Sequence, residues 1–389
     1  MKKVLISSFD LEVGGVERSL ISMLNNFDYD NYNVDLMLYS HTGDFMNLLP
    51  NQPNLLKENK DYKTFRMSIG EIIKNGKLKI VLGRIFAKIK ARGYGYKQMQ
   101  YMWKYTLRYL PKINKKYDIA ISFLWPHYYV EEKVNANLKI AWIHTDYSTI
   151  ETDVELDFKM WNKFDFIVAV SEDCKKSFLI KYPELNKKII VIENITSPNF
   201  VRIQAKEKID DFPRNKDDFN ILSVGRYCEA KGFDNAIKAL KILHDKGYKH
   251  IKWYIVGYGS DEELLKKLII DNNLEESFIL LGKKINPYPY MKACDLYIQP
   301  SRYEGRAVTV TEAQILGKPV MLTNYATAKS QVKDGYDGFI TKQSIEGIVK
   351  GIEILYKNDK LRKKLQNNCE NTDYSNNKEL EKLYKLWEI

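Results

Sequence analysis

Short apolar runs alternate with amphipathic segments along most of the chain, and this alternation predicts an α/β protein. Residues 4–7 form a short apolar run, and residues 16–27 follow with apolar positions at helical spacing. A second series begins with the apolar run 219–224 and the helical pattern 233–245. Two such series predict two doubly wound parallel-sheet domains, because strands that alternate with helices form parallel sheets.

The length of the chain and one charged stretch predict the domain boundaries. At 389 residues, the chain exceeds what a single core usually serves. Residues 201–218 are charged and show no periodicity, so we expect an interdomain linker there. We therefore expect an N-terminal Rossmann-like domain at 1–200 and a C-terminal one at 219–370. An amphipathic helix is expected within 371–389.

The stretch 300–312 carries the most specific candidate chemistry. It joins an apolar run to a helical pattern, with Glu304 in the loop and Glu312 inside the expected helix. Amides at the start of a helix attract anions, and carboxylates accept hydrogen bonds from hydroxyls. A phosphate site flanked by two carboxylates suits a sugar nucleotide. A solvated helix face is the alternative for two glutamates at this spacing.

Three other loops follow expected strands. Residues 8–15 end in Gly14 and Gly15, which a tight turn alone would also explain. Residues 225–232 hold Arg226 and Lys231, which offer a planar fork and a point charge to phosphate. His144 follows the apolar run 139–143, where open α/β sheets bind ligands. A structural histidine is the alternative.

The net charge of +11 is concentrated in one segment. Residues 72–117 contain 13 lysines and arginines, no acidic residue and many aromatic ones. Their pattern predicts an amphipathic basic helix, which suits an anionic membrane surface or an anionic acceptor. Nucleic-acid binding ranks lower, because no nucleic-acid motif accompanies the segment. An ordinary basic surface remains the third interpretation.

Neither a signal peptide nor a membrane-spanning run is expected, so we predict a cytoplasmic protein, with a peripheral position at the inner membrane face as an option. The four cysteines form no CxxC motif and are expected to be reduced. Asp28 and Asp30 form a DxD pair, but the polar turn around them favours a structural role. No metal site or cofactor is expected.

These motifs together resemble a known family. Glu304-x7-Glu312 between Pro300-Ser301 and a Gly-Lys-Pro-Val run, preceded by Gly225-Arg226-x4-Lys231-Gly232, is similar to the retaining glycosyltransferases of family 4. The resemblance implies the GT-B fold, with two Rossmann-like domains facing across a cleft and the last helix crossing back to the first domain. Residues 40–115 match no motif of the family, and 286–290 depart from its usual spacing.

The resemblance also implies the site residues. Glu304, His144, Arg226 and Lys231 would be catalytic. The donor would be bound by a larger set: Gly14, Gly15, Gly225, Arg226, Lys231, Gly257, Gly259, Glu304, Gly305, Arg306, Ala307 and Glu312. Arg306 replaces the apolar residue that is common after Glu-Gly in this family.

The implied activity is retaining transfer of a sugar from a nucleoside-diphosphate sugar, with UDP favoured. The acceptor would be a glycan or a lipid-linked glycan in cell-surface polysaccharide synthesis. The alternatives are a GT-B sugar-nucleotide epimerase and a non-catalytic GT-B partner subunit. A nicotinamide dehydrogenase is disfavoured, because no G-x-G-x-x-G follows a first strand.

Overall fold

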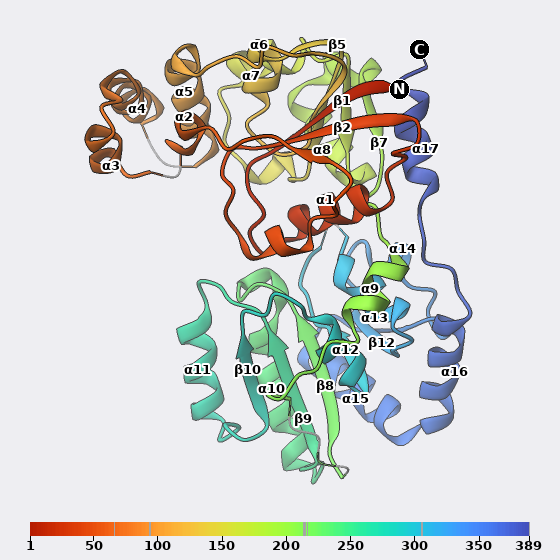
Figure 1. The fold of residues 1–389 in the computed structure, drawn as a ribbon. Helices are drawn as coiled ribbons and strands as arrows, with labels where there is room; N and C mark the ends of the chain where they lie inside the picture. The colour runs from red at the N-terminus through yellow and green to blue at the C-terminus, as the bar shows by residue number, and fades with distance from the viewer. Residues whose placement is uncertain (66, 93–94, 213–214, 216, 305, 389) are drawn as a thin grey trace. The chain divides into compact units, whose positions relative to one another are not determined.

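Two parallel β-sheets organise the chain, one in each of two units (Figure 1). The computed structural model describes residues 1–65, 67–92, 95–212, 215, 217–304 and 306–388. One unit comprises residues 1–195 and 376–389, and the other comprises 196–375. The prediction of two parallel-sheet domains is confirmed.

The first unit holds a seven-stranded sheet in the order β3-β2-β1-β4-β5-β6-β7. Its strands are β1 (Lys2–Ser8), β2 (Tyr32–Leu38), β3 (Asn54–Leu55), β4 (Lys116–Ser122), β5 (Asn135–Ile143), β6 (Phe166–Ala169) and β7 (Ile189–Val191). Its helices are α1 (Gly15–Asn25), α2 (Lys60–Lys63), α3 (Ile69–Lys74), α4 (Leu78–Ala91), α5 (Tyr96–Thr106), α6 (His127–Lys133), α7 (Val154–Trp161), α8 (Glu172–Lys181) and α17 (Lys378–Lys385).

The second unit holds a six-stranded sheet in the order β10-β9-β8-β11-β12-β13. Its strands are β8 (Phe219–Val224), β9 (Ile251–Val256), β10 (Phe278–Gly282), β11 (Leu296–Gln299), β12 (Val320–Thr323) and β13 (Phe339–Thr341). Its helices are α9 (Pro198–Gln204), α10 (Phe233–Asp245), α11 (Glu262–Asp271), α12 (Tyr288–Ala293), α13 (Val308–Ile315), α14 (Ala328–Gln331), α15 (Ile345–Lys357) and α16 (Asp359–Glu370).

Each sheet reverses its strand order at one point, and this point decides where ligands can bind. The reversal falls between β1 and β4 in the first sheet and between β8 and β11 in the second. Connections on either side of such a point leave the sheet in opposite directions and open a crevice at the carboxyl ends of the strands. The loops 8–15, 225–232 and 300–307 all leave strands at these two points.

The boundary between the units differs from the expected linker at 201–218. Val201, Ala205 and Phe212 pack in the core of the second unit, together with Leu222 and Tyr254. The apolar residues of this charged stretch are too widely spaced to give a helical or strand pattern, so the sequence did not predict their burial. The second unit therefore begins at Thr196.

The last helix packs on the first unit. Tyr384 and Trp387 lie against Phe27, with ring centroids 5.6 and 5.8 Å away. The Tyr384 hydroxyl accepts a hydrogen bond from the Asp28 amide at 3.0 Å. The side chain of Asp28 in turn caps the Asn31 amide at 3.1 Å, so the DxD pair lies in a structural turn.

The basic segment forms a helical hairpin of α4 and α5. A side chain at Gly83 would lie 2.8 Å from the Thr106 methyl group, so the two helices cross closely there. Ile80 and Val81 are buried, whereas Leu82, Phe86 and Ile89 are exposed. The expected single apolar face of this helix is thus divided between the core and the surface. None of the described helices is both long and apolar enough to cross a bilayer.

A carboxylate is fully buried in the core of the first unit. Asp157 accepts hydrogen bonds from the hydroxyls of Tyr182 at 2.7 Å and Tyr128 at 3.4 Å. Burial raises the pKa of Asp157 to about 6, and the tyrosine hydroxyls oppose this shift only in part. Because the folded pKa lies above the unfolded value, the folded state is stabilised while Asp157 is protonated. This stabilisation is lost as the pH rises through 6.

We therefore expect wild-type protein to lose about 1–2 kcal/mol of unfolding free energy relative to Asp157→Asn between pH 5 and pH 7.5. Asparagine keeps an acceptor oxygen for the tyrosines and carries no charge. Urea denaturation at several pH values measures the difference, and Asp271→Asn, at an exposed position, is the matched control. A wild-type-to-variant difference that stays constant with pH would contradict this account of Asp157.

Candidate functional site

The loops after β8 and β11 are joined to each other at the strand-order reversal of the second sheet. The Arg302 amide donates to the Ala230 carbonyl at 2.8 Å. Gly232 has φ +67°, and a side chain there would lie 2.2 Å from the Pro300 carbonyl oxygen. Glycine is therefore required for this close approach. The two loops form one rigid edge.

Glu304 is held through a single oxygen. Its Oε1 accepts hydrogen bonds from Lys231 Nζ at 2.5 Å, Ser301 Oγ at 2.6 Å and Gln299 Nε2 at 3.0 Å. The Lys231 and Glu304 side chains are 18% and 12% exposed. Within the described part of the chain, Oε2 accepts no hydrogen bond, so it is the oxygen left for a ligand.

Gln299 connects Glu304 to the start of α13. Its side chain is fully buried, and its Oε1 accepts from the Tyr297 hydroxyl at 2.9 Å and the Thr309 hydroxyl at 3.3 Å. Its Nε2 donates to Ser301 and Glu304. Because both ends of the amide are engaged, Gln299 fixes the loop carboxylate relative to the helix.

Arg302 connects the loop after β11 to the loop after β8 and to the first turn of α10. Its guanidinium donates to both carboxylate oxygens of Asp234, at 2.8 and 2.7 Å, and to the Glu229 carbonyl at 2.7 Å. The pair raises the pKa of Arg302 and, through hydrogen bonding that outweighs partial burial, lowers the pKa of Asp234. Such bidentate pairs are strong and directional.

Arg226 and Lys231 differ in their surroundings. The stem of Lys231 lies along Gly225, whose added Cβ would be 3.1 Å from Lys231 Cε. Arg226 is exposed, and it forms no hydrogen bond or ion pair with the residues that the structure describes. One cation is thus already tied to Glu304, and the other is available to an anion.

The helix α13 completes the edge. It begins after Ala307, and no described side chain caps it, so its first amides point outward. Glu312, inside the helix, is 2% exposed and accepts from the Tyr288 hydroxyl at 2.8 Å. Arg306 is exposed, and Gly305 lies outside the described residues.

Gly257 and Gly259 have a packing role that the sequence did not reveal. A side chain at Gly257 would lie 1.9 Å from the Gly225 carbonyl oxygen, and one at Gly259 would lie 2.3 Å from the Tyr227 carbonyl oxygen. The loop after β9 therefore supports the loop that carries Arg226.

In the first unit, His144 follows β5. Burial lowers the pKa of His144 to about 4, so the ring is neutral near pH 7. Its Nε2 lies 2.9 Å from the Phe123 carbonyl oxygen and must donate the proton there. Nδ1 is then an acceptor, and it is buried without a partner among the described residues.

Gly14 and Gly15 open the helix α1, and no described side chain caps it. A side chain at Gly15 would meet nothing within 4 Å, whereas one at Gly14 would meet the Glu17 carboxylate at 2.2 Å. Packing therefore leaves the space beside Gly15 open.

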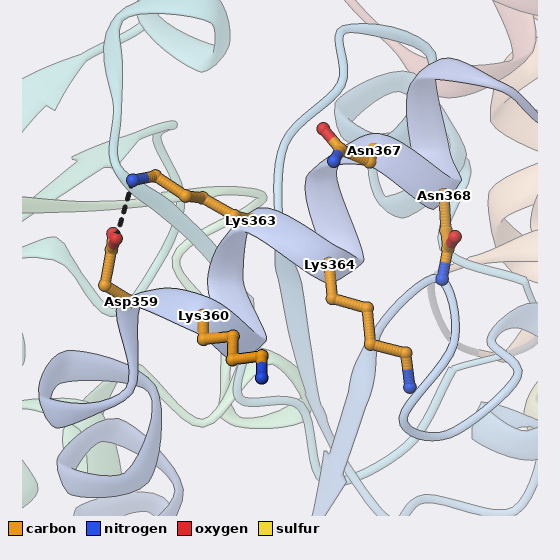
Figure 2. Close-up of a pocket in the computed structure, with 6 residues that line it drawn as sticks. All are labelled: Asp359, Lys360, Lys363, Lys364, Asn367 and Asn368. Atoms are coloured by element: carbon orange, nitrogen blue, oxygen red, sulfur yellow. Dashed lines mark ion pairs between the residues drawn. The ribbon is translucent and has the colours of Figure 1, made fainter.

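Surface hollows lined by basic residues lie elsewhere. One, of about 530 Å³, lies along α16 and is lined by Asp359, Lys360, Lys363, Lys364, Asn367 and Asn368 (Figure 2). Lys363 pairs with Asp359 at 2.8 Å. Another, of about 670 Å³, is lined by Phe86, Ile89, Lys90, Arg92, Lys97, Tyr101, Tyr105 and Asp153. The described residues include no cluster of His, Cys, Asp or Glu that could hold a metal ion.

Comparisons with known sequences relate part of the chain to glycosyltransferases. The family model described as glycosyl transferases group 1 matches residues 204–372. An uncharacterised glycosyltransferase of Methanocaldococcus jannaschii is 30% identical over 248 residues, which are 59% of this chain and 62% of that protein. The N-acetylgalactosamine-N,N'-diacetylbacillosaminyl-diphospho-undecaprenol 4-alpha-N-acetylgalactosaminyltransferase of Campylobacter jejuni is 28% identical over 216 residues, 54% of this chain and 55% of that protein. The chain thus spans less than two thirds of either relative.

A solved structure extends the likeness to the whole fold. Anabaena HepE, in complex with UDP and glucose, is similar to this chain with a TM-score of 0.63 at 17% identity, over 95% of this chain and 94% of that one. The fold is that of the GT-B glycosyltransferases, with two Rossmann-like parallel-sheet domains. The chain is thus similar to glycosyltransferases over part of its sequence and to one solved structure over most of its fold.

The structure joins Lys231 to Glu304 in an ion pair and places Arg226 in the same loop as Lys231. His144, Gly14 and Gly15 belong to the other unit. Sequence reasoning missed Gln299, Ser301, Arg302 and Tyr288. Ser301 stood inside the quoted motif, but a buried glutamine on a strand or an arginine in a loop gives no pattern of its own.

We expect Arg302→Gln to lower the unfolding free energy of the second unit by about 1–2 kcal/mol, because it breaks a bidentate pair that is only partly exposed. Lys241→Gln breaks the more exposed i,i+4 pair with Asp245 and should cost at most about 0.5 kcal/mol. Thermal unfolding scans of the two variants make the comparison. Equal small effects would show that Arg302 does not hold the loops together.

Proposed function

We propose that this chain is a retaining glycosyltransferase of family 4 that transfers a sugar from a UDP-sugar to a glycan or lipid-linked glycan in cell-surface polysaccharide synthesis. The observation that carries the proposal is the junction of β8 and β11. There, the Lys231–Glu304 pair, the start of α13 and Arg226, which pairs with none of the residues that the structure describes, lie at one edge of the sheet.

Breaking the bond between sugar and diphosphate places negative charge on the leaving group. Arg226, Lys231 and the first amides of α13 would stabilise that charge, and one such donor is worth roughly 3 kcal/mol. Lys231 would then be shared between the phosphate and Glu304. Two cations and a helix start supply this stabilisation without a metal ion, so we propose metal-independent transfer.

The sugar and the ribose would be bound by acceptors. Glu304 would present Oε2 to the hydroxyls of the donor sugar, since its other oxygen is engaged three times. His144 would accept a hydrogen bond from a hydroxyl at Nδ1. Glu312 would hold the ribose hydroxyls, exchanging or sharing its bond with Tyr288. Each of these roles pairs an acceptor with a hydroxyl.

The nucleotide and the acceptor class are inferred from the similar proteins. HepE was solved with UDP and glucose, and the Campylobacter relative is named for a diphospho-undecaprenol acceptor. A third relative is the Staphylococcus aureus capsular polysaccharide glycosyltransferase CapM, 27% identical over 212 residues, 52% of this chain and 55% of that protein. These names support a UDP-sugar donor and a cell-surface glycan.

The basic segment supports a position at the cytoplasmic face of a membrane. Within 72–117, the cationic side chains of Lys79 and Lys88 are exposed on α4, beside exposed apolar residues. Each basic residue near an anionic bilayer contributes roughly 1 kcal/mol. Under this proposal the hairpin of α4 and α5 faces the lipid surface that carries the acceptor.

Glu304→Ala and Arg226→Ala should each lower UDP release from a hydrolysed UDP-sugar by about 10²–10³-fold, with EDTA present throughout. UDP-glucose and UDP-N-acetylglucosamine are the first probes, chosen by thermal stabilisation against GDP- and ADP-sugars. Glu275→Ala, an exposed glutamate, is the control and should keep the wild-type rate. Unchanged turnover in both site variants would remove the assignment, and complete loss in EDTA would reject the metal-independent mechanism.

Wild-type protein should float with anionic phosphatidylglycerol vesicles at low salt and should remain unbound with neutral phosphatidylcholine vesicles. Lys79→Gln with Lys88→Gln should weaken this binding about tenfold, because two charges leave the lipid-facing helix. Lys266→Gln with Lys267→Gln on α11 makes the same charge change elsewhere and should have little effect. Equal binding to both kinds of vesicle would reject the electrostatic part of the proposal.

A further inference from the structure

Several large apolar residues of helix α4 are exposed to solvent. Leu78, Leu82, Phe86 and Ile89 are 60, 56, 60 and 68% exposed. Residues three or four apart share a helix face, so these four form one stripe. The face turned to the protein holds Ile80 and Val81 together with Gly83, Ala87 and Ala91. A helix that only covers a core keeps its large apolar residues on the buried face. Contiguous exposed apolar surface, as on α4, marks an interaction site.

The stripe leads into the hollow of about 670 Å³ near the end of α4, because Phe86 and Ile89 line both. Apart from Asp153, the remaining lining is cationic and aromatic. Tyr101 and Tyr105 stack with centroids 6.2 Å apart and an interplanar angle of 15°. An apolar track therefore ends in a polar, positively charged recess.

The cations of the hollow are available to an anion. Lys90 and Arg92 are exposed and form no ion pair with any residue in the described ranges. Lys97 pairs with Glu151 at 2.7 Å, but that glutamate is 79% exposed and is easily displaced by a stronger anion.

Asp153, the carboxylate that lines the hollow, already accepts a hydrogen bond at each oxygen. One Asp153 oxygen accepts from the Tyr101 hydroxyl, and the other accepts from the Leu156 amide at 3.1 Å. The hydrogen bond from Tyr101 is the main cause that lowers the pKa of Asp153. Three cations therefore outweigh a carboxylate whose oxygens both have partners.

We propose that this hollow binds the phosphate end of an anionic lipid whose hydrocarbon chain lies along the α4 stripe. The Arg92 guanidinium matches two phosphate oxygens, and the ammonium groups of Lys90 and Lys97 add charge. The exposed stripe gains from covering apolar surface. This inference rests on the proposed lipid-linked acceptor and names the residues that would hold its phosphate.

A second copy of this chain fits the same surface poorly. Lys79, Lys88 and Lys90 border the stripe, and two such surfaces would bring like charges together. Nucleic acid would satisfy the cations but would leave the apolar stripe in water. A lipid phosphate satisfies both parts at once.

Isothermal titration of the full chain with farnesyl diphosphate tests the proposal, with inorganic pyrophosphate and farnesol as the phosphate-only and chain-only probes. We expect farnesyl diphosphate to bind at least about tenfold more tightly than pyrophosphate, because the chain adds apolar contact. Lys90→Gln with Arg92→Gln should weaken it at least about tenfold. Phe86→Ser with Ile89→Ser should remove the advantage over pyrophosphate.

The matched control is the α16 hollow in Figure 2, which is also rich in lysine but includes no apolar side chain in its lining. Lys360→Gln with Lys363→Gln should leave the affinity unchanged. The proposal is overturned if farnesyl diphosphate binds no better than pyrophosphate, or if Arg226→Ala abolishes binding while the Lys90 and Arg92 changes do not. It is also overturned if Phe86→Ser dissolves a dimer of the chain. Since the readout is binding, loss of the proposed transfer activity would leave this test intact.

Discussion

The ion pair between Lys231 and Glu304 is the contact on which the candidate site depends. It joins loops that lie 73 positions apart in the sequence, and its partners are 2.5 Å apart. The pair forms because β8 and β11 are neighbours in a parallel sheet, so their carboxyl ends meet at the same edge. Arg302 and Gly232 hold the two loops in the register that the pair requires.

This arrangement separates groups that the protein engages from groups that it leaves without a partner, within a few residues. Oε1 of Glu304 is consumed by the protein, whereas Oε2 and Arg226 have no partner among the described residues. In the first unit, His144 shows the same division: Nε2 donates to a carbonyl, whereas Nδ1 is buried without a partner among the described residues. Polar atoms that lack a hydrogen-bond partner beside others that have several are typical of a preorganised binding site.

Much of this could be predicted from the sequence. The strand 219–224 and the helix 233–245 were expected at the bounds that the structure gives them, because apolar runs and helical spacing are local signals. The positions of Arg226, Lys231 and Glu304 followed from their loops. Gln299 and Arg302 did not, since their roles come from partners distant in sequence. The sequence predicted an amphipathic basic helix in the segment that forms α4. Only the packing of α4 against α5 shows which of its apolar residues stay exposed.

The most direct test of the central claim is a crystal structure of the chain with UDP. The account predicts diphosphate density between Arg226 and the first turn of α13, with Lys231 within hydrogen-bond distance of a phosphate oxygen and the uridine ribose toward Glu312. Nucleotide density at any other place, with the edge formed by the loops after β8 and β11 left without ligand, would contradict it.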